Sequence, residues 1–158
     1  MIHNKVMDLR QDKFLQMNKL EKDSSLVLYQ DVIWGDADAF GHVNNTVYFR
    51  YFEDVRIAYF VKTGVLETKE TLNLGPILAT TQCDFKLPLT YPDRIHIGCK
   101  AMITGPKKVL MEYTIFSERF NEVAATGSSL VIFYDYNNSC SCEIPEQVST
   151  AIKTYAHS

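Results

Sequence analysis

The clearest pattern of apolar and polar positions predicts a long helix from Asn45 to Lys62. At 100° per residue, one stripe of this helix is apolar and rich in aromatic rings: Tyr48, Tyr51, Phe52, Val55, Ala58 and Tyr59. A second apolar group lies on the opposite side and contains Phe49, Ile57 and Phe60. Asn44 or Asn45 can cap the first turn, and Gly64 is placed to end the helix in the left-handed conformation. Because a helix that is apolar on two sides is usually buried, we expect this one at the centre of the domain.

The remaining pattern is typical of strands. A run of β-branched and aromatic residues predicts a strand over 26–34, and alternation of period two predicts four more after Gly75-Pro76, over 77–87, 94–103, 109–117 and 122–136. Consecutive strands with short turns favour an antiparallel sheet that wraps around the helix, which is an α+β layout. Residues 1–25 are expected to form an N-terminal extension with weak helical spacing, and residues 26–158 to form a single domain that ends in a short helix over 146–155.

Composition excludes several classes of function. A chain of 158 residues suffices for one ordinary domain, and a net charge of −3 argues against nucleic acid or a membrane surface as the partner. No apolar run approaches the ~20 residues of a membrane helix, and we expect no secretory signal because residues 1–25 carry charges throughout and have no continuous apolar stretch. The cysteine pair Cys140-x-Cys142 has no partner at metal-binding spacing, so we expect free thiols, a cytoplasmic location, no metal and no cofactor.

Candidate chemistry is concentrated between the first strand and the long helix. The loop Trp34-Gly-Asp36-Ala-Asp38-Ala-Phe40-Gly41-His42-Val43-Asn44-Asn45 carries two carboxylates and one imidazole. A helix N-terminus offers unpaired N–H groups and a positive partial charge, which can stabilise an oxyanion. A carboxylate beside it can activate water or attack a carbonyl itself. These groups together provide what hydrolysis of an activated ester requires.

The segment from Trp34 to Arg56 resembles the active-site motif of the 4-hydroxybenzoyl-CoA thioesterase-like family of acyl-CoA thioesterases. The resemblance implies a hotdog fold, in which an antiparallel sheet of about five strands wraps around one long helix. It implies that Asp38 is the catalytic carboxylate, as general base or as nucleophile, and that Asn45 opens the helix whose backbone N–H faces the thioester oxygen. Some family members carry a histidine side chain at that position, whereas here the histidine, His42, lies three residues earlier.

Other residues are secondary candidates. Tyr48 and Tyr51 are expected to border the acyl group, and His42 either positions the ligand or is a half-buried structural histidine. Glu53 is a second candidate carboxylate, unless it forms an ion pair with Arg50 or Arg56. The resemblance implies that Lys107 and Lys108, which follow a turn between two strands, contact the phosphates of coenzyme A.

The leading hypothesis is therefore an acyl-CoA thioesterase whose substrate is a coenzyme A or carrier-protein thioester. Two alternatives stay open: a hotdog hydratase or dehydratase, and a non-catalytic module that binds acyl thioesters. Since a lone sheet leaves an edge unpaired, and the family joins sheets edge to edge, we expect a homodimer or homotetramer with the site at the interface.

Overall fold

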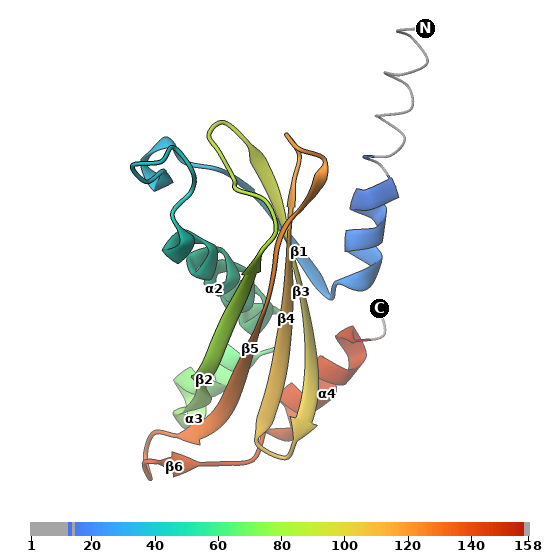
Figure 1. Ribbon diagram of the computed structural model, residues 1–158. Coiled ribbons are helices and arrows are strands. Elements are labelled where there is room, and N and C mark those ends of the chain that lie inside the picture. The colour runs from blue at the N-terminus through green and yellow to red at the C-terminus, as the bar shows by residue number, and fades with distance from the viewer. Residues whose placement is uncertain (1–12, 14, 157–158) are drawn as a thin grey trace, which may run out of the picture.

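The computed structural model describes residue 13 and residues 15–156 of the chain. Its centre is a curved antiparallel sheet with the strand order β1-β3-β4-β5-β2 and a short β6 paired to β5 (Figure 1). The strands are β1 (Leu26–Asp31), β2 (Leu74–Phe85), β3 (Arg94–Gly105), β4 (Lys108–Ser117), β5 (Glu122–Asp135) and β6 (Cys140–Ser141). This arrangement confirms the α+β hotdog layout that the sequence predicts.

The long helix α2 (Asn45–Lys62) lies against the inner face of the sheet, with the predicted bounds (Figure 1). Its buried side chains include Phe52 and Val55, which are fully inaccessible to solvent, and the ring of Phe52 stacks on that of Tyr113 at 4.6 Å between centroids. The alternation predicted for β3 is confirmed, because Ile95, Ile97, Cys99 and Ala101 all face this core. A terminal helix, α4 (Glu146–Tyr155), adds Val148 and Ile152 to the same cluster.

Three local predictions differ from the structure. The first strand ends at Asp31 rather than Trp34, because its pairing with β3 stops opposite Arg94 and a 3-10 turn, η1 (Trp34–Asp36), follows. The strand predicted over 77–87 occupies Leu74–Phe85. An additional helix, α3 (Val65–Leu72), lies between Gly64 and Asn73, which both adopt left-handed backbone conformations.

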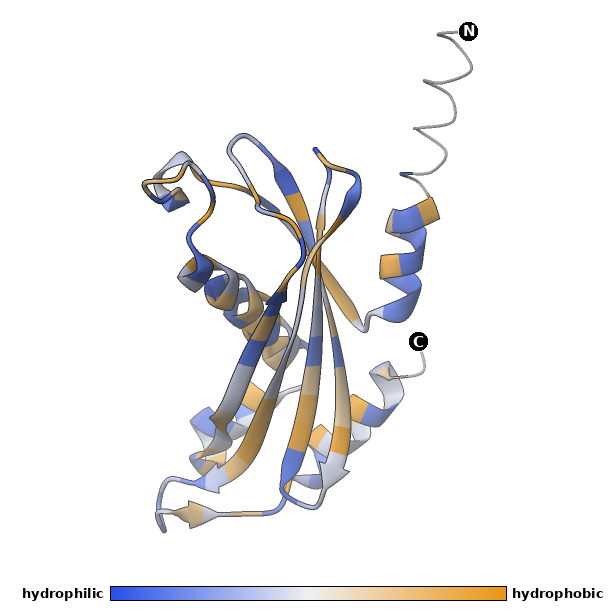
Figure 2. Ribbon diagram, viewed as in Figure 1, coloured by the Kyte–Doolittle hydropathy of each residue, from blue (hydrophilic) through white to orange (hydrophobic). Residues whose placement is uncertain are grey.

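The N-terminal segment packs on the outer face of the sheet. Residues 15–23 form a helix that is predominantly hydrophilic (Figure 2), and it meets the sheet at Gly98 of β3. A Cβ atom at Gly98 would lie 2.8 Å from a methyl carbon of Leu20 and closer still to Ser24, so only glycine permits this approach. The described residues of the expected N-terminal extension therefore pack against the domain. Residues 1–12 and 14 lie outside the described residues.

The sheet has one conspicuously open edge. β2 pairs with β5 along one side, and most of its residues are exposed, including Ile77 and Leu78. The helices in the described part of the chain include none that is long and apolar enough to cross a membrane.

Candidate active site

The loop between β1 and α2 is held in shape by its own backbone. Asp38 accepts the Gly41 N–H at its carbonyl oxygen at 3.0 Å and donates its own N–H to the His42 carbonyl at 2.8 Å. The Asp38 carboxylate accepts the Phe40 N–H through Oδ1 at 2.8 Å. Gly41 closes this turn with a φ of 78°, a region that L side chains rarely adopt. The result is a tight turn that fixes where the Asp38 carboxylate points.

A second segment, after β2, is tied to this loop through Leu89. The Leu89 carbonyl accepts the Val43 N–H at 2.8 Å, and its N–H donates to the hydroxyl of Tyr48 at 3.0 Å. Leu89 itself is completely buried. The start of α2, the Asp38 loop and the end of β2 are therefore joined around one buried backbone unit.

The first turn of α2 leaves a donor available. The Asn44 side chain is the cap, since its Oδ1 accepts the Thr46 N–H at 2.9 Å, and the Val47 N–H goes to the Asn44 carbonyl at 3.0 Å. The N–H of Asn45, the first helical residue, has no acceptor within the described residues. A backbone donor at the positive end of the helix dipole is thereby free to bind an anion.

Asp38 and the start of α2 line one pocket of about 310 Å³. Asn45 and Tyr48 contribute from the helix, and the opposite wall comes from the end of β2 and the residues after it: Phe85, Lys86, Leu87 and Pro88. The Phe85 ring meets that of Tyr48 edge-on at 5.0 Å. Phe85 and Lys86 are residues that sequence reasoning missed as site candidates; their position at the end of a strand, just before Pro88, was the available signal.

The other acid of the loop, Asp36, has a structural partner. Its carboxylate forms an ion pair with Arg50 of α2 at 2.7 Å, and the Tyr51 hydroxyl donates to it at 3.5 Å. The Asp36 side chain is 11% exposed. Asp36 thus attaches the loop to the helix, while Asp38 faces the pocket.

Tyr48 and Tyr51, the two candidate tyrosines of the helix, are protonated at neutral pH. Burial raises the pKa of Tyr48, partly offset by the Leu89 N–H. Burial, together with the nearby charge of Asp36, raises the pKa of Tyr51 well above its ordinary value. Neither phenol is therefore placed to act as a base, and Asp38 is the carboxylate among the described residues that line this pocket.

The remaining sequence candidates lie outside this pocket. His42 is exposed on the loop, and Tyr51 is buried beside Asp36. Glu53 lines a separate surface hollow with Arg50, yet Arg50 pairs with Asp36 rather than with Glu53. Arg56 is buried and donates to the Tyr113 hydroxyl at 3.3 Å, so the expected pairing with Glu53 is wrong for both arginines.

Lys107 lies in the turn between β3 and β4 and Lys108 is the first residue of β4, at the opposite end of the sheet from the Asp38 loop (Figure 1). Lys107 there donates to the Ser141 carbonyl at 3.0 Å. Within one chain these lysines are therefore not part of the pocket.

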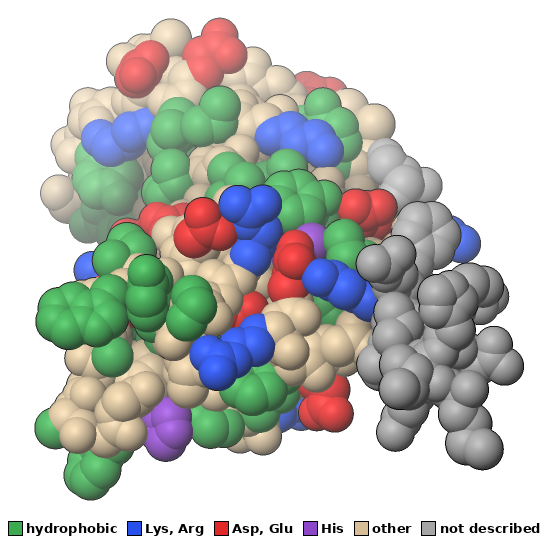
Figure 3. Space-filling view, turned by 90° about the horizontal axis from the view of Figure 1, so that it is seen from above, with side chains coloured by type: hydrophobic (Ala, Val, Ile, Leu, Met, Phe, Trp, Pro, Cys, Tyr) green, Lys and Arg blue, Asp and Glu red, His purple; other side chains and the backbone are tan. Residues whose placement is uncertain are grey.

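The surface around the loop is unusually apolar. Ile33, Trp34 and Phe40 project from it, and Trp34 and Phe40 are 76% and 85% exposed. Seen from this end of the molecule, hydrophobic side chains gather on the side where the loop lies (Figure 3). Large exposed apolar groups beside a pocket are typical of ligand or subunit contacts.

The curved antiparallel sheet around one long helix defines the class of hotdog-fold proteins. The comparison with known families agrees: residues 32–152 match the model of the thioesterase-like superfamily, and the chain belongs to that family.

Individual relatives are similar over different lengths. The uncharacterized protein YsmA of Bacillus subtilis (strain 168) is 34% identical over 83 residues, which are 52% of this chain and only 54% of that protein. A putative esterase of Aquifex aeolicus (strain VF5) is 25% identical over 119 residues, 75% of this chain and 90% of that protein.

Solved structures confirm the fold. The PA5185 protein of Pseudomonas aeruginosa PAO1 superposes with a TM-score of 0.74 at 25% identity and covers 84% of this chain and 92% of its own. SAV2348 of Staphylococcus aureus, solved in complex with CoA, gives a TM-score of 0.77 at 19% identity, with 82% of each chain covered. A thioesterase of Thermus thermophilus, complexed with coenzyme A and Zn, gives 0.74 at 23% identity, covering 87% of this chain and 98% of its own.

Proposed function

We propose that this protein is an acyl-CoA thioesterase that hydrolyses an acyl thioester to a free acid and a thiol. The observation that carries the proposal is that Asp38 and the free N–H end of α2 line the same pocket. Membership of the thioesterase-like superfamily supports the reaction class. Two structural neighbours that were solved with coenzyme A support this thiol as the leaving group.

In this proposal the thioester carbonyl lies at the start of α2 with its oxygen towards the Asn45 N–H. The charge that develops on this oxygen during attack is stabilised by the backbone donor and the helix dipole. Such a donor contributes on the order of 10²–10³ in rate in related acyl-transfer chemistry. The role assigned to Asn45 is therefore that of its backbone, with its side chain as part of the pocket wall.

Asp38 is assigned the role of general base or nucleophile in this proposal. The Phe40 N–H holds Oδ1, while Oδ2 has no hydrogen-bond partner among the described residues. This oxygen either accepts a proton from an attacking water or attacks the carbonyl to form an anhydride that water then cleaves. In both routes the C–S bond breaks and the thiolate leaves, to be protonated by solvent.

A second subunit is part of the proposal. The exposed β2 edge, with Ile77 and Leu78, is available to pair with the same strand of another copy. Because β2 runs directly into Phe85 and Lys86, this pairing would place the partner next to the pocket. A homodimer or homotetramer with the site at the interface is the expected assembly, and Lys107 and Lys108 would then reach a site only from a second subunit.

The test is thiol release from short, medium, long and aromatic acyl-CoAs by the wild type and by Asp38→Asn. We expect turnover in the wild type and a loss of about 10²–10⁴-fold in the variant, as for removal of a general base. The matched control is Glu53→Gln, which removes a helix carboxylate outside the pocket and should retain activity. Full activity in Asp38→Asn, or its loss only in Glu53→Gln, contradicts the assignment.

The same panel separates the alternatives. An enoyl thioester formed without free thiol would indicate a hydratase or dehydratase. Tight acyl-CoA binding with no product would indicate a binding module.

A further inference from the structure

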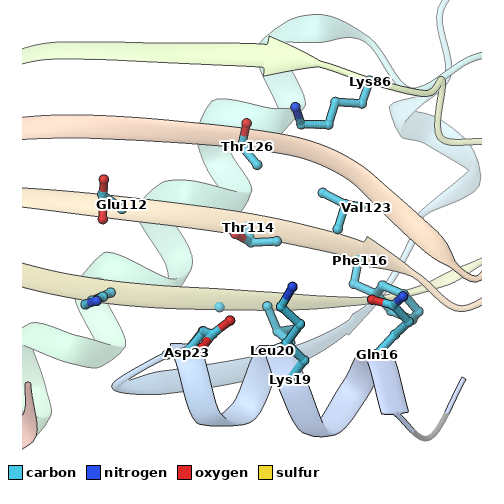
Figure 4. Close-up of a pocket in the computed structure, with 13 residues that line it drawn as sticks. Gln16, Lys19, Leu20, Asp23, Lys86, Glu112, Thr114, Phe116, Val123 and Thr126 are labelled. Atoms are coloured by element: carbon cyan, nitrogen blue, oxygen red, sulfur yellow. The ribbon is translucent and has the colours of Figure 1, made fainter. Parts of the chain in front are cut away.

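A hollow of about 520 Å³ lies on the outer face of the sheet and away from α2. The N-terminal helix (residues 15–23) forms one wall, and strands β3, β4 and β5 form the floor (Figure 4). We refer to this hollow as the outer groove. It depends on a segment that precedes the family match at residues 32–152, so nothing in that match assigns it a role.

Three lysines face the outer groove from three different elements. Lys19 comes from the N-terminal helix, Lys86 follows β2, and Lys100 belongs to β3. Two acids, Asp23 and Glu112, also line it, which leaves one net positive charge in a chain whose net charge is −3. None of these five side chains takes part in an ion pair within the described residues. The ammonium groups are thus outside any ion pair, with Lys100 lying opposite Glu112 in the register of β3 and β4, and they are available to an anion.

The floor of the outer groove offers both hydroxyl donors and apolar surface. Thr114 and Thr126 are neighbours across β4 and β5, and neither hydroxyl has a hydrogen-bond partner in the described part of the chain. Phe116 and Val123 lie beside them, and Leu20 faces them from the helix (Figure 4). The outer groove thus combines hydroxyl groups and apolar surface with the three lysines.

Lys86 connects the outer groove with the Asp38 pocket, because it lines both. Its side chain extends over the sheet towards Thr126 (Figure 4). The two hollows therefore meet at the end of β2, one with the reacting carboxylate and the other with the lysines.

We propose that the outer groove holds the phosphorylated arm of the thiol leaving group while the thioester lies at Asp38. The arm passes Lys86, and Lys19 and Lys100 bind its phosphates. This inference rests on the proposed thioesterase function, and it assigns phosphate binding to residues other than Lys107 and Lys108. It also gives the N-terminal helix a role in substrate binding.

The first experiment measures binding without turnover. Coenzyme A is titrated calorimetrically into the full-length wild type, into Lys19→Ala/Lys100→Ala, and into Lys22→Ala/Lys153→Ala, a control with the same change of charge at two exposed lysines that line neither hollow. Loss of two charge-assisted contacts should weaken binding by about tenfold or more in the first variant and leave the control unchanged. Equal affinity in wild type and Lys19→Ala/Lys100→Ala overturns the proposal, as does no binding to the wild type.

The second experiment separates the arm from the reaction centre. Hydrolysis of an acyl-CoA is compared with hydrolysis of the N-acetylcysteamine thioester of the same acid, which has no phosphates. The Lys19→Ala/Lys100→Ala variant should show a higher KM for the acyl-CoA, by about tenfold, with kcat/KM for the short thioester unchanged. Equal losses on both substrates overturn the proposal, since they indicate damage to the Asp38 pocket.

The two proposals fail in different ways. If the wild type hydrolyses no thioester but binds coenzyme A through Lys19 and Lys100, the thioesterase assignment is wrong and the outer groove stands as a coenzyme A site. If the wild type hydrolyses acyl-CoAs and the Lys19→Ala/Lys100→Ala variant has the same KM, only the inference about the outer groove is wrong.

Discussion

The hydroxyl of Tyr48 accepts the backbone N–H of Leu89 at 3.0 Å, in a buried position between the start of α2 and the segment that follows β2. This one bond joins two parts of the pocket wall that lie 41 residues apart in the chain. It also commits the hydroxyl to a structural role, so that the ring rather than the oxygen of Tyr48 faces the substrate.

Tyr48→Phe should consequently destabilise the fold. The change removes the acceptor and leaves the buried Leu89 N–H unsatisfied, which costs about 1–3 kcal/mol. Displacement of the 85–89 segment should lower kcat/KM by roughly tenfold, far less than Asp38→Asn does. Urea unfolding and steady-state kinetics measure the two effects. An unchanged free energy of unfolding would show that the bond contributes nothing.

The ion pair between Asp36 and Arg50 should matter more than an exposed ion pair. Asp36→Asn keeps the shape but removes the charge from a side chain that is only 11% exposed. We expect the free energy of unfolding to fall by about 1 kcal/mol and the loop that carries Asp38 to be attached less firmly to α2. Asp31→Asn is the control, because Asp31 and its partner Arg94 are 67% and 57% exposed and their pair should contribute at most about 0.5 kcal/mol. Thermal unfolding measures the stability that each variant loses. Comparable losses in Asp36→Asn and Asp31→Asn would contradict the prediction.

Gly127 of β5 allows the central helix to approach the sheet. A Cβ atom there would lie 2.5 Å from the Phe52 ring carbon Cζ and 2.6 Å from the Gln82 carbonyl oxygen, so Gly127→Ala must displace a fully buried ring. The expected destabilisation is about 1–3 kcal/mol or more. Gly105→Ala, whose Cβ would meet no atom closer than 4.0 Å, is the matched control. If both variants unfold at the same denaturant concentration, the close packing is not a constraint.

The cysteines should differ in reactivity. Burial raises the pKa of Cys83 to about 11 and that of Cys99 to about 12, so both are protonated thiols at pH 8, whereas Cys140 is exposed on β6. Because the thiolate is the reactive species, iodoacetamide at pH 8 should modify Cys140 first and Cys99 only after unfolding. Peptide mapping by mass spectrometry gives the order. Rapid modification of Cys99 in the folded protein would contradict it.

The sequence predicted the elements that its local signals delimit. Helices α2 and α4 have the expected bounds because a capping asparagine and a proline mark their starts. The Asp38 loop and the helix that follows it were predicted as one unit because they are adjacent in the chain.

What the sequence could not predict depends on contacts between distant segments. The apolar run after Asp31 continues to Trp34, yet the strand ends where its partner β3 begins, at Arg94. Arg56 carries a charge that favours an exposed position, but its head group reaches the hydroxyls of Tyr113 and Ser129 inside the fold. Lys86 could be recognised as part of the pocket only once the end of β2 was placed beside Asn45.

The position of β1 at the edge of the sheet also has a consequence for synthesis of the protein. Asp31 pairs with Arg94, which is 63 residues further along the chain, and α2 lies between them. At about 5–20 residues per second, the ribosome adds those residues over roughly 3–13 s. During this interval α2 has left the ribosome before the strands that cover its aromatic face. Nascent chains are therefore most vulnerable to aggregation before β3 emerges.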